Sequence, residues 1–289
     1  MTATARRRGL PRVVRSILRS RSATIGFGLV LLHVLLALLA PVLAQHDPVV
    51  NDPNAVLQLP GGAYPLGTDT LGRDILSRTL YGGRYALTTS LTATAIVVLL
   101  GTVIAGLAAF YGGWLDDLIT RVLDSVLAVP AILSLLVVVT VFGSGTWVLI
   151  MAIVVVYTGG VIRIVRAAAM DVLPRDYVTA ARARGEGVWY ILAREVLPNI
   201  LDVVLVEFAM RASWVLLLIS SLSFLGFGAN PPTPDWGLMV AENRSLMALV
   251  PLATVAPMVS LATLIVGLNL ASDGLAKSLG VDRMKEIVG

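Results

Sequence analysis

The sequence predicts an all-α integral membrane protein with six transmembrane helices, and two observations support this fold class. First, 57% of the 289 residues are hydrophobic and 14% are charged, with a mean hydropathy of +0.86, whereas soluble domains carry about 25% charged residues. Second, six apolar runs each contain the ~20 residues that a helix needs to span the hydrocarbon of a bilayer. The runs cover residues 23–44, 88–112, 119–143, 147–168, 201–227 and 250–272.

The polar composition excludes several classes of function. The chain has no cysteine and two histidines; His33 lies inside the first apolar run and His46 lies just after it. Disulfides, thiolate chemistry and histidine-based metal sites are therefore not expected. The basic pI of about 9.7 does not indicate nucleic acid, because the positive charges lie at the ends of the apolar runs rather than along one polar face. Membrane lipid is the expected surrounding of most of the chain.

The first span, 23–44, follows a basic tail over 1–22, and we expect it to remain as an anchor. The alternative is a cleaved signal peptide, since Val42 and Ala44 have the spacing of a signal-peptidase site. A signal peptide has a shorter apolar core of roughly 7–15 residues. The length of this run and of the tail before it favours the anchor.

The placement of lysine and arginine predicts the orientation, because loops rich in these residues stay in the cytoplasm. With the N-terminus inside, seventeen of them fall in cytoplasmic segments and four in outer segments, while Arg211 lies inside a span. The cytoplasmic set is Arg6, Arg7, Arg8, Arg12, Arg15, Arg19, Arg21, Arg121, Arg163, Arg166, Arg175, Arg182, Arg184, Arg194, Lys277, Arg283 and Lys285. The outer set is Arg73, Arg78, Arg84 and Arg244. The tails 1–22 and 276–289 and the loop 170–200 are therefore predicted to be cytoplasmic.

Residues 45–87 form the predicted extracytoplasmic segment between the first two spans. Thr68 or Asp69 could cap a helix there, with Ile75 and Leu80 on its apolar face and Arg73 and Arg78 elsewhere. We expect this helix to lie in the membrane interface, either to steer the chain into the second span or to dock an external partner.

Small and charged residues predict how the next two spans are held. In the second span Gly101, Ala105 and Gly106 allow another helix to approach closely. In the third span Asp117 and Asp124 lie four and three residues from Arg121, so they can pair with it at the membrane surface.

The loop 170–200 contains "YVTAARARGEGVWYILAREVLPN" at 177–199. One face of a predicted short helix carries Tyr177, Ala180, Ala181 and Arg184. Gly185 and Gly187 permit a sharp turn after this helix, and the fifth span is expected to start in a new direction at Pro198. A short helix with a small-residue face suits docking into a groove of another protein.

Three separated motifs resemble one family. "AARARG" at 180–185 and "LPN" at 197–199 resemble the coupling-loop signature of permease subunits in binding-protein-dependent ABC importers. "GTDTLGRDILSRTLYGGR" at 67–84 and "LSFLGFGANPPTPDWG" at 222–237 are similar to the branch that carries dipeptides, oligopeptides and, in some members, nickel. The second of the two permeases of that branch is the nearer match.

This resemblance implies a type I ABC importer transmembrane domain in the bacterial inner membrane, with a permease core over 88–275. Such a chain forms half of a translocation pore, here for dipeptides or short oligopeptides. Nickel chelates, haem and glutathione are alternative cargoes, and an ion-gradient-driven secondary transporter is the alternative of a different class. The chain lacks a G-x-x-x-x-G-K-[ST] loop for nucleotide phosphates. It is therefore not expected to be an enzyme or to bind a cofactor, and ATP and Mg are expected on partner ATPases.

The resemblance also implies partners and contact residues. The expected partners are a homologous second permease, two ATPase domains or subunits and an extracytoplasmic substrate-binding protein, without nucleic acid. The implied ATPase-coupling residues are Tyr177, Thr179, Ala180, Ala181, Arg184, Gly185, Glu195 and Pro198. Thr179 and Ile219 stand where the family often has an acid, and Glu195 stands where this branch commonly has histidine. These departures suggest docking charges adapted to a dedicated ATPase.

Two further sites have open roles. Glu207 and Arg211 lie inside the fifth span, with Arg211 ~15 Å from its cytoplasmic end at ~1.5 Å per residue. Charges at that depth cost roughly 2.5–3.5 kcal/mol, so they should face protein or water. Their spacing of four residues allows a pair, which either lines the substrate path or is structural only. Trp236 in "PPTPDWG" is expected to pack against the partner permease, with substrate contact as the alternative.

Overall fold

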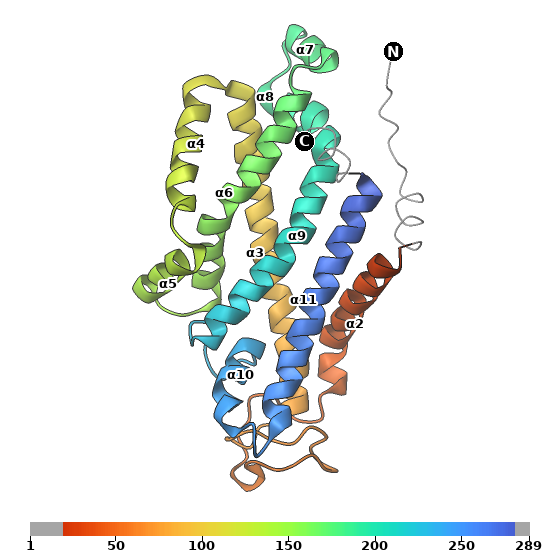
Figure 1. Ribbon diagram of the computed structural model, residues 1–289, viewed down its shortest axis with the longest axis vertical. Coiled ribbons are helices and arrows are strands. Elements are labelled where there is room, and N and C mark those ends of the chain that lie inside the picture. Colours follow the sequence, from red (N-terminus) through yellow and green to blue (C-terminus); the bar gives the residue numbers. More distant parts are fainter. Residues whose placement is uncertain (1–19, 281–289) are drawn as a thin grey trace.

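The computed structural model describes residues 20–280, and in this range the protein is helical without any strand (Figure 1). The main helices are α2 (Arg21–Leu43), α3 (Ile75–Tyr111), α4 (Gly113–Leu127), α5 (Ala131–Phe142), α6 (Thr146–Val172), α7 (Asp176–Ala183), α9 (Leu197–Phe224), α10 (Trp236–Asn243) and α11 (Pro251–Leu279). The short elements are η1 (Pro53–Ala55), α8 (Val188–Tyr190), the π-helical η2 (Ile191–Val196) and η3 (Arg244–Leu246). The tails predicted over 1–22 and 276–289 lie mostly outside the described residues, and α11 includes the first residues of the second tail.

The predicted all-α membrane fold is confirmed. Five helical stretches are long and apolar enough to cross a membrane: α2, α3, α6, α11 and the run from Val188 to Phe224 that joins α8, η2 and α9. The bent pair of α4 and α5 makes a sixth if it is counted as one span, so the predicted six is the upper number for residues 20–280. The first, fourth and sixth predicted spans begin within two residues of α2, α6 and α11.

The second predicted span, 88–112, is the later part of α3, which already begins at Ile75. The helix predicted to lie in the membrane interface is the first part of the same α3. Asp74 caps α3, since its Oδ2 accepts a hydrogen bond from the backbone N–H of Ser77 at 3.0 Å. The predicted cap at Thr68 or Asp69 is therefore wrong. No proline occurs between residues 75 and 111, so every turn keeps its N–H donors. The expected interfacial helix is instead the beginning of α3 and follows the direction of that span.

The third predicted span, 119–143, is broken in the structure. α4 and α5 are bent by 86° across the short break between them. Pro130 is the N-cap of α5; it has no N–H to continue the hydrogen bonds of α4, and it disfavours a helical conformation at Val129 before it. In Figure 1, α4 runs beside α6 whereas α5 turns away from the direction of α4.

The acidic residues of α4 pair with α6 rather than with Arg121. Asp116 forms an ion pair with Arg166, and Asp124 pairs with Arg163 at 2.9 Å. The prediction that Arg121 is the partner of these acids is wrong. Residues spaced along one helix can also reach a neighbouring helix, and here the pairs connect α4 to α6.

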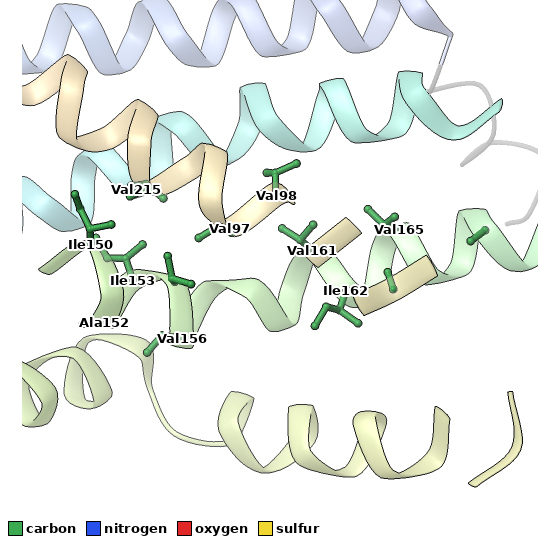
Figure 2. Close-up of a cluster of buried hydrophobic side chains, with 14 of the residues drawn as sticks. Val97, Val98, Ile150, Ala152, Ile153, Val156, Val161, Ile162, Val165 and Val215 are labelled. Carbon is green, nitrogen blue, oxygen red and sulfur yellow. The ribbon is translucent and has the colours of Figure 1, made fainter. Parts of the chain in front are cut away.

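The largest part of the core lies between α3, α6 and α9. Figure 2 shows Val97 and Val98 of α3 and Val161 of α6 in one buried cluster, to which Val215 of α9 also belongs. A Cβ on Gly101 would lie 2.7 Å from Cγ1 of Val161. The close approach predicted at Gly101 is thus confirmed, because only a residue without a side chain fits there.

A second seam of small residues joins α2 to α11. A Cβ on Gly26 would lie 2.5 Å from the backbone nitrogen of Ala271, and one on Gly274 would lie 2.3 Å from the Cβ of Ala23. His33 adds a polar contact across this seam, since its Nε2 lies 3.1 Å from the carbonyl oxygen of Ser260 in α11, while its Nδ1 lies 2.9 Å from that of Leu29 in α2 itself. The first span is therefore packed closely against the last.

The α2–α11 seam gives a matched pair of substitutions. Gly26→Leu places a side chain against the backbone of α11, and overpacking of this kind costs typically 1–3 kcal/mol. Gly28→Leu is the control, because nothing lies within 4 Å of a Cβ at residue 28. We expect only Gly26→Leu to lower the midpoint of thermal unfolding of the purified protein in detergent; equal midpoints for the two variants would contradict the seam.

Candidate functional site

The predicted docking helix exists as α7. It stands at one end of the bundle, beyond the ends of α6 and α9 (Figure 1). Val178 and Ala181 are fully buried in the same core cluster as Ile191 and Val196. The Cζ atom of Arg182 lies 4.6 Å from the centroid of the Phe110 ring, a distance suited to cation–π attraction. α7 is therefore anchored to the chain by one face and free on the other.

One of the four residues predicted on the exposed face of α7 is buried in the structure. Ala181 is 0% exposed, so its grouping with the docking residues is wrong: it turns inward with Val178, three residues before it on the helix. Tyr177, Thr179, Ala180 and Arg184 are exposed. The sequence pattern could not separate Ala180 from Ala181, because alanine suits a buried helix face and a docking face equally well.

The turn after α7 has the predicted glycine. Gly185 has φ +77° and open space around its Cα, a conformation that glycine adopts without strain. Arg184 and Glu186 flank it, with Nε and Oε1 3.7 Å apart on the exposed surface. Such a pair contributes little to stability, so both charges remain available to a partner.

Pro198 does not start a span in a new direction. It lies in the first turn of α9, and the helical run continues from Val188 to Phe224. The π-helical turn of η2 lies directly before it, where the N–H of Leu197 bonds to the carbonyl of Leu192 five residues back. π-helical turns of this kind are found frequently at functional sites. Glu195 lies within this turn and is half-buried, and its backbone carbonyl accepts a hydrogen bond from Nδ2 of Asn199 at 2.6 Å.

The pair predicted inside the fifth span is present. Nε of Arg211 donates to Oε2 of Glu207 at 3.1 Å, and their side chains are 19% and 6% exposed. Arg211 is the fifteenth residue of the 28 in α9, ~21 Å from its first residue at ~1.5 Å per residue. Arg211 also lines a pocket of about 250 Å³ with Tyr157 and Gly160 of α6 and the break between α4 and α5. One member of the charged pair, Arg211, thus lines a pocket between α6, α9 and the α4–α5 break.

A buried cluster of charges at the other end of the molecule was not foreseen. Asp69, Arg73 and Arg78 are 1–3% exposed, although the sequence placed both arginines on the polar side of an exposed helix. Oδ2 of Asp69 lies 2.7 Å from Nε of Arg73 and 3.6 Å from Nε of Arg78. Glu242 of α10 adds a contact of 3.0 Å to Arg73, and Arg78 donates to the carbonyl of Pro48 at 2.8 Å. Because Glu242 comes 169 residues after Arg73, no spacing rule could reveal the cluster.

Trp236 is not available to a partner permease in this structure. It is 3% exposed, its Nε1 donates to the carbonyl of Thr79 at 2.8 Å, and its indole fills the space beside Gly82 and Gly83 of α3. Burial raises the pKa of the neighbouring Asp235 carboxyl, while hydrogen bonds from Ser223 and three backbone N–H groups act in the opposite direction. The expectation that Trp236 forms an interface is wrong, since its ring packs inside its own chain.

Within residues 20–280 no group of three or more His, Cys, Asp or Glu side chains could hold a metal ion. The geometry defines a class of protein, a multi-pass helical membrane protein. A short helix at one end of the bundle is buried on one face and exposed on the other, and a charged pair near the middle of α9 includes an arginine that lines a pocket. These features suit a membrane transport subunit.

Comparison with known proteins specifies the class. Residues 97–281 match the family described as binding-protein-dependent transport system inner membrane component, and residues 11–60 match the N-terminal transmembrane domain of oligopeptide transport permease C. The chain belongs to this family of ABC importer permeases. It is accordingly a transport subunit rather than an enzyme, and the family works with ATPase subunits and binding proteins.

Curated relatives agree over most of the chain. A dipeptide transport system permease protein from Haemophilus influenzae is 36% identical over 267 residues, 90% of each chain. A glutathione transport system permease protein from Pectobacterium atrosepticum is 35% identical and covers 92% of this chain and 88% of its own. A di/tripeptide transport system permease protein from Pseudomonas aeruginosa is 35% identical, with coverage of 92% and 89%.

The outer charge cluster yields a stability prediction. Arg78→Met leaves Asp69 and Glu242 with one arginine in a buried site, and removal of one partner of a buried ion pair costs about 3–5 kcal/mol. Arg84→Met is the matched control, six residues further on α3 and exposed. Thermal unfolding of the detergent-solubilised protein should shift downward for Arg78→Met and stay unchanged for Arg84→Met. A thermostable Arg78→Met variant would show that the cluster does not hold the outer segment.

Proposed function

We propose that this chain and a homologous second permease form the translocation pore of an importer for dipeptides or short oligopeptides in the bacterial inner membrane. The match of residues 11–60 to the oligopeptide permease N-terminal domain is the observation that supports this substrate class most directly. The dipeptide and di/tripeptide permeases among the relatives support it further. An extracytoplasmic binding protein delivers the peptide to the outer end.

In this proposal α7 is the joint that couples the pore to ATP. Two partner ATPases bind ATP and Mg and hold the exposed residues Tyr177, Thr179, Ala180, Arg184 and Gly185 of the joint, together with the half-buried Glu195. The buried contacts of Val178 and Ala181 with Ile191 and Val196 connect α7 to the base of α9. A displacement of α7 by the ATPases is therefore transmitted to the helix that carries Glu207 and Arg211, with Pro198 in its first turn.

Glu207 and Arg211 line the substrate path in this proposal. The position of Arg211 at a pocket supports this role, because an arginine that served packing alone could be enclosed on all sides. The opposite charges neutralise each other when the path is empty, which reduces the cost of placing them in a span.

Glutathione is the second candidate substrate. The relative from Pectobacterium atrosepticum, named a glutathione transport system permease protein, supports it. Glutathione is itself a tripeptide, so the two candidates share one chemical class and differ in the preferred length and linkage.

The energy source tests the proposed function. Proteoliposomes with the full complex and its binding protein should import a radiolabelled dipeptide when ATP is present on the ATPase side. Import should persist when ionophores collapse the ion gradients. Uptake that proceeds without ATP and stops with ionophores would instead identify a secondary transporter.

The orientation is testable because the chain has no cysteine. Gly187→Cys and Gly62→Cys both introduce a thiol at a residue with open space around it. A membrane-impermeant maleimide should label Gly62→Cys in intact cells and label Gly187→Cys only after permeabilisation. Labelling of Gly187→Cys in intact cells would reverse the proposed topology.

The docking face of α7 is tested at Ala180. Ala180→Arg places a large charged side chain where the ATPase groove is expected, and a misfit of 1.4 kcal/mol already weakens binding tenfold. We expect roughly tenfold or greater loss of ATP-driven import, together with loss of co-purified ATPase. Ala193→Arg is the control, an exposed alanine beyond the turn. If both variants transport at the wild-type rate, α7 does not dock through this face.

A further inference from the structure

Arg211 has hydrogen-bonding capacity that the chain does not use. A guanidinium carries five N–H donors. Its Nε–H donates to Glu207, and neither Nη group has an acceptor among residues 20–280. The side chain is 19% exposed and borders the pocket of about 250 Å³. The unused donors can therefore be reached by a molecule in that pocket.

The orientation of this guanidinium is fixed from two sides. Glu207 holds the Nε edge from one turn earlier on α9. Gly160 of α6 lies against the other edge, where a Cβ would be 2.7 Å from Nη2 and 3.0 Å from Nη1. The missing side chain at residue 160 lets the guanidinium lie against α6. A donor group that is held in place before binding loses less conformational freedom when a ligand arrives.

The rest of the pocket lies at the break between α4 and α5 and is apolar apart from the hydroxyl group of Tyr157. Val126, Leu127, Val129 and Pro130 contribute from the break, and Tyr157 contributes from α6. A water needs only ~10–15 Å³ of such space, so the pocket accommodates a larger polar group together with an apolar side chain. One cationic group on an apolar wall suits a ligand that ends in one anionic group.

We propose that an Nη group of Arg211 binds the free α-carboxylate of the transported peptide, so that the peptide passes α9 with its carboxyl end in the pocket between α6 and the α4–α5 break. This inference rests on the proposed peptide substrate. Glu207 uses the Nε edge of the guanidinium and Gly160 covers the edge between Nη1 and Nη2, so the carboxylate accepts a single charge-assisted hydrogen bond from an outer N–H of one Nη group. The ammonium end of a peptide is repelled from the same place, and a doubly charged anion would be opposed by Glu207 beside it.

Glu207 keeps this contact weak. Its carboxylate already neutralises Arg211, so an arriving carboxylate shares the positive charge instead of meeting it alone. A pore needs such sharing, because a substrate that binds tightly at the middle of the path leaves slowly.

The test compares dialanine with its C-terminal amide and its N-acetyl form in the reconstituted full complex. Each peptide is supplied at a concentration that saturates the binding protein, and the import rates are expressed as ratios. The binding protein is the same in every complex, so its own preference cancels when the ratios of two variants are compared. We expect Arg211→Gln to reduce the preference for the free carboxyl over the amide by roughly tenfold. The ratio between dialanine and its N-acetyl form should stay unchanged.

Two further variants make the outcome decisive. Glu207→Gln leaves Arg211 without its neutralising partner and should raise the preference for the free carboxyl, which keeps the inference testable if Arg211→Gln fails to assemble. Arg84→Gln removes an exposed arginine and should leave all ratios unchanged. Import that is intact but shows the wild-type free-acid to amide ratio in Arg211→Gln or Glu207→Gln would overturn this inference alone. Absence of ATP-driven peptide import by the wild-type complex would overturn the proposed function itself.

Discussion

Close contact between helices is the interaction on which the rest of this structure depends. Inside a bilayer the hydrophobic effect does not drive helices together, because lipid tails are as apolar as the side chains. Close van der Waals packing must therefore hold the spans together. Gly101 against Val161 and Gly26 and Gly274 against α11 and α2 supply contacts that any larger residue would prevent. The helices α3, α6 and α9 share one core cluster, and in this arrangement Gly160 of α6 lies against Arg211 of α9.

Ion pairs lie at three levels of the bundle, and at the outer and the opposite level they connect different elements. At the outer end Asp69, Arg73, Arg78 and Glu242 tie the segment before α3 to α10. In the middle Glu207 and Arg211 pair on α9. Towards the other end Asp116 and Asp124 of α4 hold arginines of α6. In the outer cluster Asp69, Arg73 and Arg78 are almost closed to solvent and Glu242 lies at the rim, whereas Arg211 of the middle pair lines a pocket. This difference supports a structural role for the cluster and the proposed transport role for Arg211.

The short helix α7 shows how one segment can serve two contacts. Val178 and Ala181 face the chain, whereas Ala180 and Tyr177 face away from it. A loop that was loosely attached would move without displacing the spans. The buried half of α7 connects it to η2 and α9, and the π-helical turn of η2 lies at the point where this connection enters the long helix.

The amino-acid sequence by itself determined the membrane class, most span positions, the glycine turn at Gly185 and the Glu207–Arg211 pair. These features depend on local composition and on spacing along one helix, which a linear sequence displays directly. Only the tertiary structure decided which of Ala180 and Ala181 is buried, that Trp236 packs against α3, that the acids of α4 pair with α6, and that Glu242 joins Arg73. Each of these depends on a contact between helices far apart in the chain, and the free energy of such a contact is set by the neighbour that folding brings close.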